Sequence, residues 1–414
     1  MRWLLVAVSL VAVSLATAPP SHAAEPGLTL DQAVTRALEK NAEILSLAAE
    51  IEAERARADG ASRLLRSNPS LEAELGPRLR SQEDASLALE VRLTQSVEIA
   101  GQRGARIDAA SARVAAAEAR LHARKNDLTA GVKARFAHVL AARRRVELAT
   151  EAQALAEQAK SAAEQRSRAG AAGQIEVNTA RIEVGRATRE HAEAERALGV
   201  ALGELMLLLA WDPSEDLELA GELGATSKAP SFDLPALIAQ AKRGRFELAV
   251  ARSEIAAAEA EQRLSGREAF PDLHVGAAYA REEPGTQIVL GTLGIDLPLF
   301  DRNQARRGVS AARLAQASRS LEEIERQVER EVRTAFARYT AARRAADAYA
   351  GDVATALAQS LELANEAYRA GKFDFFQLML IRRETLEARR GHIEALEELA
   401  SAEAELARTA GGPP

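Results

Sequence analysis

The sequence predicts an α+β protein made of two structural repeats, each of which combines long coiled-coil helices with β-hairpins. Three observations predict this fold class: an internal repeat of roughly 200 residues, heptad spacing of apolar residues over very long stretches, and short stretches of alternating apolar residues. The composition agrees, because 47% of the residues are hydrophobic but only 4% are aromatic, which favours long helices over a thick globular core.

The first residues predict a signal peptide. Arg2 precedes an apolar run over residues 3–18, and a small-x-small cleavage site ends at Ala23. We therefore expect residues 1–23 to direct export from the cytoplasm and then to be removed. The chain has no cysteine, so export brings no disulfides. No later run reaches the ~20 apolar residues of a membrane helix, so a membrane span would have to be built from strands.

Matching residues recur in the same order in both halves of the chain. The clearest matches are Pro69 with Pro271, Gln102 with Gln304, and Arg168-Ala169-Gly170 with Arg369-Ala370-Gly371. A repeat of this size indicates a duplicated half-protein rather than a solenoid unit. We expect a first repeat over residues 24–210, an equatorial connector over residues 211–233, a second repeat over residues 234–410 and a tail over residues 411–414.

Each repeat begins with a helix and ends with two longer ones. Thr29 and Gln32 form a capping-box pattern, and helical patterning runs from there to about Arg66. Further on, heptad spacing relates Ile107, Val114, Leu121 and Leu128, and later Leu314, Leu321 and Val328. We expect long helices over residues 103–169 and 303–369, each roughly 100 Å in length. Each turns at a glycine, Gly170 or Gly371, and returns as a helix over residues 175–210 or 373–407.

Alternating apolar residues predict strands over about residues 70–97 and 272–298. The apolar sets are Leu71, Ala73 and Leu75; Leu87, Leu89, Val91 and Leu93; Leu273, Val275, Ala277 and Tyr279; and Val289, Leu293, Ile295 and Leu297. Strands of a membrane barrel show this period, with apolar residues outside and polar residues inside, and so does a soluble hairpin packed on helices.

Four strands do not close a barrel, and lipid does not tolerate open sheet edges. If the strands span a membrane, several chains must therefore combine their strands in one barrel, eight strands from a dimer or twelve from a trimer. The apolar stripes of the long helices are narrow and rich in alanine, so these helices must also pack side by side with other helices. One assembly meets both needs: a ring of subunits with a strand barrel at one end and a helical barrel at the other.

This duplicated order, with its glycine turns, resembles the TolC-like outer membrane efflux protein family over essentially the whole mature chain. The segment Glu98-Ile99-Ala100-Gly101-Gln102-Arg103 resembles the signature of the heavy-metal, CzcC-like branch. The resemblance implies a homotrimer with a twelve-stranded barrel in outer-membrane lipid and an α-helical barrel in the periplasm. It also implies the exit duct of a tripartite, RND-type efflux system that exports divalent heavy-metal cations, with a periplasmic adaptor (membrane fusion protein) and an inner-membrane RND pump as partners.

The resemblance also implies site residues at the helical tips. Glu176 falls at the position of an acidic gate residue, and Tyr368 at that of its tyrosine partner, which we expect on a neighbouring subunit. The family's paired aspartates would fall at Gln377 and Leu380, so we expect Asp374 to supply a substitute acidic ring. We expect the two tip turns to dock the adaptor, through Arg168, Ala169, Gly170, Arg369, Ala370 and Gly371.

The sequence contains no pattern of catalytic chemistry. The histidines lack the spacing of a metal site, and there is no phosphate-binding glycine loop or Gly-x-Ser-x-Gly motif. We therefore expect no enzyme activity, no bound metal and no cofactor, and the absence of a basic block argues against nucleic acid. Two other readings stay open: a multidrug efflux duct of the same architecture, and a periplasmic coiled-coil scaffold or adaptor.

Overall fold

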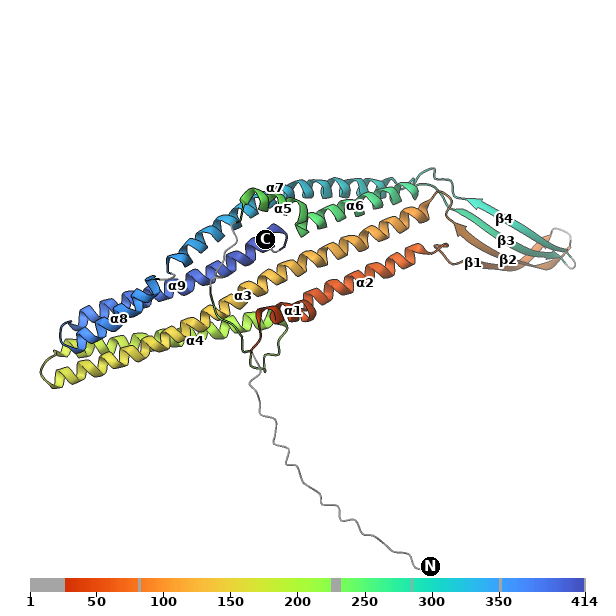
Figure 1. The fold of residues 1–414 in the computed structure, drawn as a ribbon. Helices are drawn as coiled ribbons and strands as arrows, with labels where there is room; N and C mark the ends of the chain where they lie inside the picture. Colours follow the sequence, from red (N-terminus) through yellow and green to blue (C-terminus); the bar gives the residue numbers. More distant parts are fainter. Residues whose placement is uncertain (1–26, 81–82, 225–231, 284–285, 350–351, 413–414) are drawn as a thin grey trace, which may run out of the picture.

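The computed structural model describes residues 27–80, 83–224, 232–283, 286–349 and 352–412. The expected signal peptide and the last residues of the expected tail lie outside these ranges, as does part of the connector. The described chain is an elongated body of helices with a small sheet at one end (Figure 1). At the other end, two short turns each connect one helix to the next. No helix among the described residues is sufficiently long and apolar to cross a membrane.

The first repeat consists of four helices and a hairpin in the expected order. Its elements are α1 (Leu30–Lys40), α2 (Ala42–Ser62), β1 (Ser70–Arg80), β2 (Glu83–Val97), α3 (Gln102–Arg168) and α4 (Gln174–Leu209). The predicted capping box opens α1, because the Thr29 hydroxyl accepts a 3.3 Å hydrogen bond from the Gln32 amide and the Gln32 side chain accepts one from Thr29. The heptad helix α3 is continuous over 67 residues.

The second repeat follows the same order with one more helix. Its elements are α5 (Leu234–Gly244), α6 (Phe246–Arg267), β3 (Leu273–Glu283), β4 (Thr286–Ile295), α7 (Gln304–Ala348), α8 (Asp352–Arg369) and α9 (Phe375–Ala410). The buried Gln102 and its counterpart Gln304 behave alike at the starts of α3 and α7. Each side chain accepts a 2.7 Å hydrogen bond from the backbone amide two residues earlier.

Three predicted helices are divided in the structure, and one of them is the opening helix of the second repeat, which is divided into α5 and α6 at Arg245. The single helix expected over residues 303–369 is replaced by α7 and α8. Helix α7 ends at Ala348, and α8 begins at Asp352, a residue type that favours a helix start. The first helix is divided at Asn41, whose extended backbone ends α1 and whose side chain caps α2 through the Glu43 amide.

The four strands form one antiparallel sheet in the order β1-β2-β3-β4, so the central pair β2–β3 joins the two repeats. The register brings Ala73, Val91, Tyr279 and Val289 opposite one another on one face. The next row, on the other face, contains Glu72, Arg92, Ala278 and Leu290. The predicted apolar sets of the four strands therefore share one face. Leu297 lies beyond the end of β4.

The apolar core of the helical body is divided between the two repeats. One cluster joins α1, α3 and α4 around Val132, Phe136 and Leu205, and a matching cluster joins α5, α7 and α9 around Val332, Tyr339 and Leu399. Helix α3 packs against α2, α4, α6 and α9, so it connects both halves. This arrangement brings the α3–α4 turn and the α8–α9 turn to the same end of the body (Figure 1).

Candidate functional site at the helical tips

The two tip turns have the same geometry in both repeats. Gly170 and Gly371 have φ angles of 74° and 73°, a left-handed conformation that glycine adopts without strain. The amide of Ala171 donates to the carbonyl of Arg166 over 2.9 Å, and that of Lys372 donates to Ala367 over the same distance. These six-to-one bonds define a Schellman ending, which satisfies the last carbonyls of α3 and α8.

All six residues expected to dock an adaptor are exposed in the described chain: Arg168, Ala169, Gly170, Arg369, Ala370 and Gly371. A Cβ atom added at Gly170 or Gly371 would meet no atom within 4 Å, so both turns face open space. The turns therefore present small, uncovered surfaces at the end of the body.

The predicted pair Glu176 and Tyr368 is in direct contact beside these turns. The Tyr368 phenol donates a 2.7 Å hydrogen bond to a carboxylate oxygen of Glu176, and the tyrosine is only 4% exposed. The expectation that the pair bridges neighbouring subunits is corrected, because the bond joins α4 and α8 of one chain. Glu176 lies in the first turn of α4 and Tyr368 in the last turn of α8, and both helix ends lie at the tip.

Arg166 completes this contact and was not predicted. Its guanidinium carbon lies 5.0 Å from the centre of the Tyr368 ring, and its Nε atom lies 3.7 Å from the Glu176 carboxylate. We call Arg166, Glu176 and Tyr368 the tip triad. Comparison of the repeats could not reveal Arg166, because the equivalent residue of the second repeat is Ala367.

The tip triad keeps Tyr368 protonated. Burial, and then the hydrogen bond to the Glu176 carboxylate, raise the pKa of Tyr368 above its ordinary value. The phenol therefore remains a donor throughout the physiological pH range. Behind it, an apolar cluster that includes Ala163, Val177 and Phe375 fills the space between α3, α4, α8 and α9.

Asp374 has a capping role that the sequence analysis did not consider. Its carboxylate accepts a 2.8 Å hydrogen bond from the Gln377 amide, and the Gln377 side chain accepts a 3.0 Å bond from the Asp374 amide. This is a capping box at the start of α9. The side chains of Asp374, Gln377 and Leu380 are all exposed near the tip.

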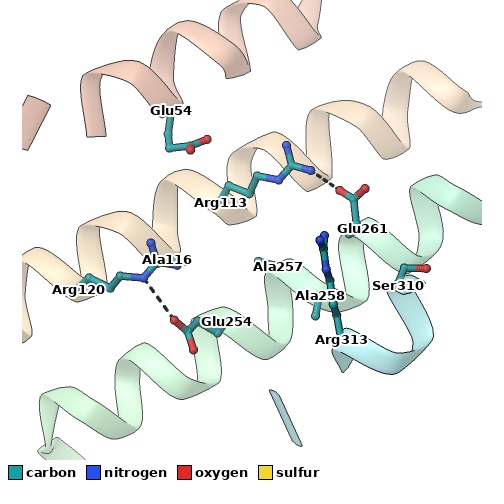
Figure 2. Close-up of a pocket in the computed structure, with 10 residues that line it drawn as sticks. All are labelled: Glu54, Arg113, Ala116, Arg120, Glu254, Ala257, Ala258, Glu261, Ser310 and Arg313. Carbon is teal, nitrogen blue, oxygen red and sulfur yellow. Dashed lines mark hydrogen bonds and ion pairs between the residues drawn. The ribbon is translucent and has the colours of Figure 1, made fainter. Parts of the chain in front are cut away.

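Ion pairs connect the helices between the tips and the sheet. Figure 2 shows Arg113 and Arg120 of α3 directed toward Glu261 and Glu254 of α6, and the second pair is 3.3 Å apart. They line a cavity of about 330 Å³. In the ranges that the structure describes, no group of three or more histidine, aspartate or glutamate side chains is placed to hold a metal ion.

Comparison with known proteins identifies the relatives of this fold. The model of the "Outer membrane efflux protein" family matches residues 33–210 and 237–412. The cobalt-zinc-cadmium resistance protein CzcC of Cupriavidus metallidurans is 27% identical over 249 residues. That match covers 58% of each protein, so the chain spans little more than half of the length of this relative.

Solved structures show the same fold over almost the whole chain. The outer-membrane channel OprN has a TM-score of 0.77 at 21% identity, covering 92% of this chain and 90% of its own. The open state of the MtrE channel of Neisseria gonorrhoeae has a TM-score of 0.76 at 20% identity, with 94% and 90% covered. CusC has a TM-score of 0.74 at 18% identity, with 92% of both chains covered. The matched family is one of outer membrane efflux proteins, and these neighbours are channels, not enzymes.

Proposed function

Because the chain belongs to the outer membrane efflux protein family, we propose that it is the outer-membrane exit duct of a tripartite efflux system for divalent heavy-metal cations. The observation that carries the proposed cargo is the similarity to a cobalt-zinc-cadmium resistance protein. Family membership supports an outer-membrane channel and leaves the alternative of a periplasmic scaffold without support.

The sheet supports a pooled barrel as the membrane-spanning part. Strands β1 and β4 are the two edges of the described sheet, and one face exposes large apolar side chains such as Leu71, Val289 and Leu293. Lipid requires every strand edge to be paired, so edge β1 of one subunit would pair with edge β4 of the next. Three chains would then provide twelve strands with the apolar face in lipid and the polar face around the lumen.

The tips support docking on a periplasmic adaptor that connects the duct to an inner-membrane RND pump. Gly170 and Gly371 lie on exposed turns without side-chain bulk, so a helical hairpin of the adaptor can approach their backbones closely. The tip triad would hold the helices closed until the adaptor displaces it. The pump would supply the selection and the energy, and the duct would conduct passively.

Deletion of the gene in its Gram-negative host tests the proposed cargo. We expect hypersensitivity to zinc, cobalt and cadmium with unchanged sensitivity to dyes, detergents and antibiotics. Complementation with the intact gene should restore metal resistance. Hypersensitivity to amphiphilic compounds alone would reject metal export and favour a multidrug duct of the same architecture.

A further inference from the structure

A cavity of about 530 Å³ lies between α4 and α9, with α3 beneath it. Its volume falls in the range of small-molecule sites. The residues that give it apolar character are Leu155 of α3 and Phe376, Met379, Leu380 and Leu386 of α9. Phe376 and Leu380 are 58% and 59% exposed, so a hydrocarbon group placed there would remove much apolar surface from water.

Arg382 lines the same cavity and is only 7% exposed. One terminal nitrogen donates a 2.8 Å hydrogen bond to the Leu155 carbonyl, and the other donates to the side-chain oxygen of Asn365. Its Nε atom is buried without a partner. Among the described residues no carboxylate forms an ion pair with it, although a buried charge ordinarily requires one.

Three other arginines that line this cavity differ from Arg382, because each forms an ion pair with a carboxylate. Arg186 pairs with Glu183, Arg383 with Glu387 and Arg390 with Glu190. Burial lowers the pKa of Arg382 to about 10, which leaves its guanidinium charged at neutral pH. The cavity therefore combines an apolar wall with a buried cation whose counter-ion is not provided by the described chain.

We propose that this cavity binds an amphiphilic carboxylate, whose head group pairs with the Arg382 guanidinium and whose hydrocarbon chain lies along the apolar residues of α3 and α9. A carboxylate is the matching partner, because it accepts two parallel hydrogen bonds from a guanidinium edge and neutralises its charge. The inference does not depend on the cargo of the duct, and the cavity lies next to the tip triad, since Arg382 is close enough to Tyr368 to act on its pKa.

Binding of dodecanoate to the full-length protein in lipid nanodiscs tests the proposal. Calorimetric titration, corrected for partitioning into empty nanodiscs, should show saturable binding to the unaltered protein. Arg382→Met should weaken it about tenfold or more, the loss expected for a charge-assisted pair. Arg389→Met is the matched control and should leave binding unchanged, because this arginine of the same helix lies outside the cavity lining and is already paired with Glu151.

Two further comparisons separate the head group from the chain. Dodecanol and dodecyltrimethylammonium have the same hydrocarbon chain without a negative charge, and both should bind far more weakly than dodecanoate. Ala156→Phe should reduce dodecanoate binding by filling the floor of the cavity while Arg382 stays in place. Equal binding of dodecanoate and dodecanol, equal binding by the Arg382→Met variant, or no saturable binding to the unaltered protein would overturn the proposal.

Discussion

The Tyr368 phenol donates a 2.7 Å hydrogen bond to the Glu176 carboxylate, and this bond joins α8 of the second repeat to α4 of the first. The two helices belong to one chain, so each subunit can hold its own pair of tips together. Arg166 lies against both residues and shields the contact from one side. The proposed gate contact therefore forms within each subunit and not between subunits.

Removal of this bond is expected to open the tip. Glu176→Ala combined with Tyr368→Phe eliminates a hydrogen bond to a charged group, a loss of about 1.5–3 kcal/mol. Single-channel conductance in planar bilayers should therefore rise. Tyr349→Phe is a matched control, because it removes a phenol at the end of α7 that stacks on His392 instead. Unchanged conductance in the double variant would reject the gate.

Alkaline pH is expected to open the same contact. The pKa of Tyr368 is raised by burial and by Glu176, so the folded tip holds the phenolic proton more tightly than the unfolded chain does. The stabilisation is complete below about pH 10, the ordinary tyrosine pKa, and is lost as the pH rises through the higher folded value. Conductance of the unaltered channel should rise only above about pH 10. The same rise in Tyr368→Phe would show that another group is responsible.

The glycine turns allow a test of adaptor docking. Gly170→Glu with Gly371→Glu adds bulk and charge to both turns, and we expect it to abolish efflux while the protein still assembles. Gly170→Ala with Gly371→Ala is the control, because each substitution adds the same left-handed strain of about 1–2 kcal/mol with little bulk. The alanine variant should retain most efflux. Normal metal resistance of the glutamate variant would exclude these turns as the docking surface.

The two faces of β4 are expected to respond differently to charge. Val289→Arg places a cation on the apolar face, where lipid exposure near the bilayer centre would cost about 2–4 kcal/mol. Leu290→Arg places the same cation on the face that contains Glu72 and Arg92. The amount of folded protein in outer-membrane fractions should fall for the first variant alone. An equal fall for both would argue against a lipid-facing apolar surface.

Sequence patterns predicted the order of elements well, since both repeats retain the same turns and the same periodicity. The left-handed turns at Gly170 and Gly371 could be located because they match each other in the two repeats. The division at Asn41 was missed, because its effect depends on local capping of α2 and on a hydrogen bond from its amide to the distant Leu208 carbonyl. Apolar periodicity does not record such polar contacts.

The tip triad occupies positions at which the repeats differ, and this limits what the sequence can predict. Glu176 corresponds to Gln377, and Arg166 corresponds to Ala367. Family resemblance located Glu176 and Tyr368, but only the packing of four helix ends reveals Arg166. The burial of Arg382 could not be predicted from the sequence either, because an arginine in a charged helix is ordinarily expected in solvent.

Release of zinc from preloaded cells tests the central claim most directly. Cells that lack the gene, cells that express the intact gene and cells that express the Gly170→Glu, Gly371→Glu variant are loaded with zinc, and the metal appearing in the medium is followed over time. We predict rapid release only with the intact gene and background release in the other two strains. Equal release from all three strains would contradict an exit duct for divalent metals.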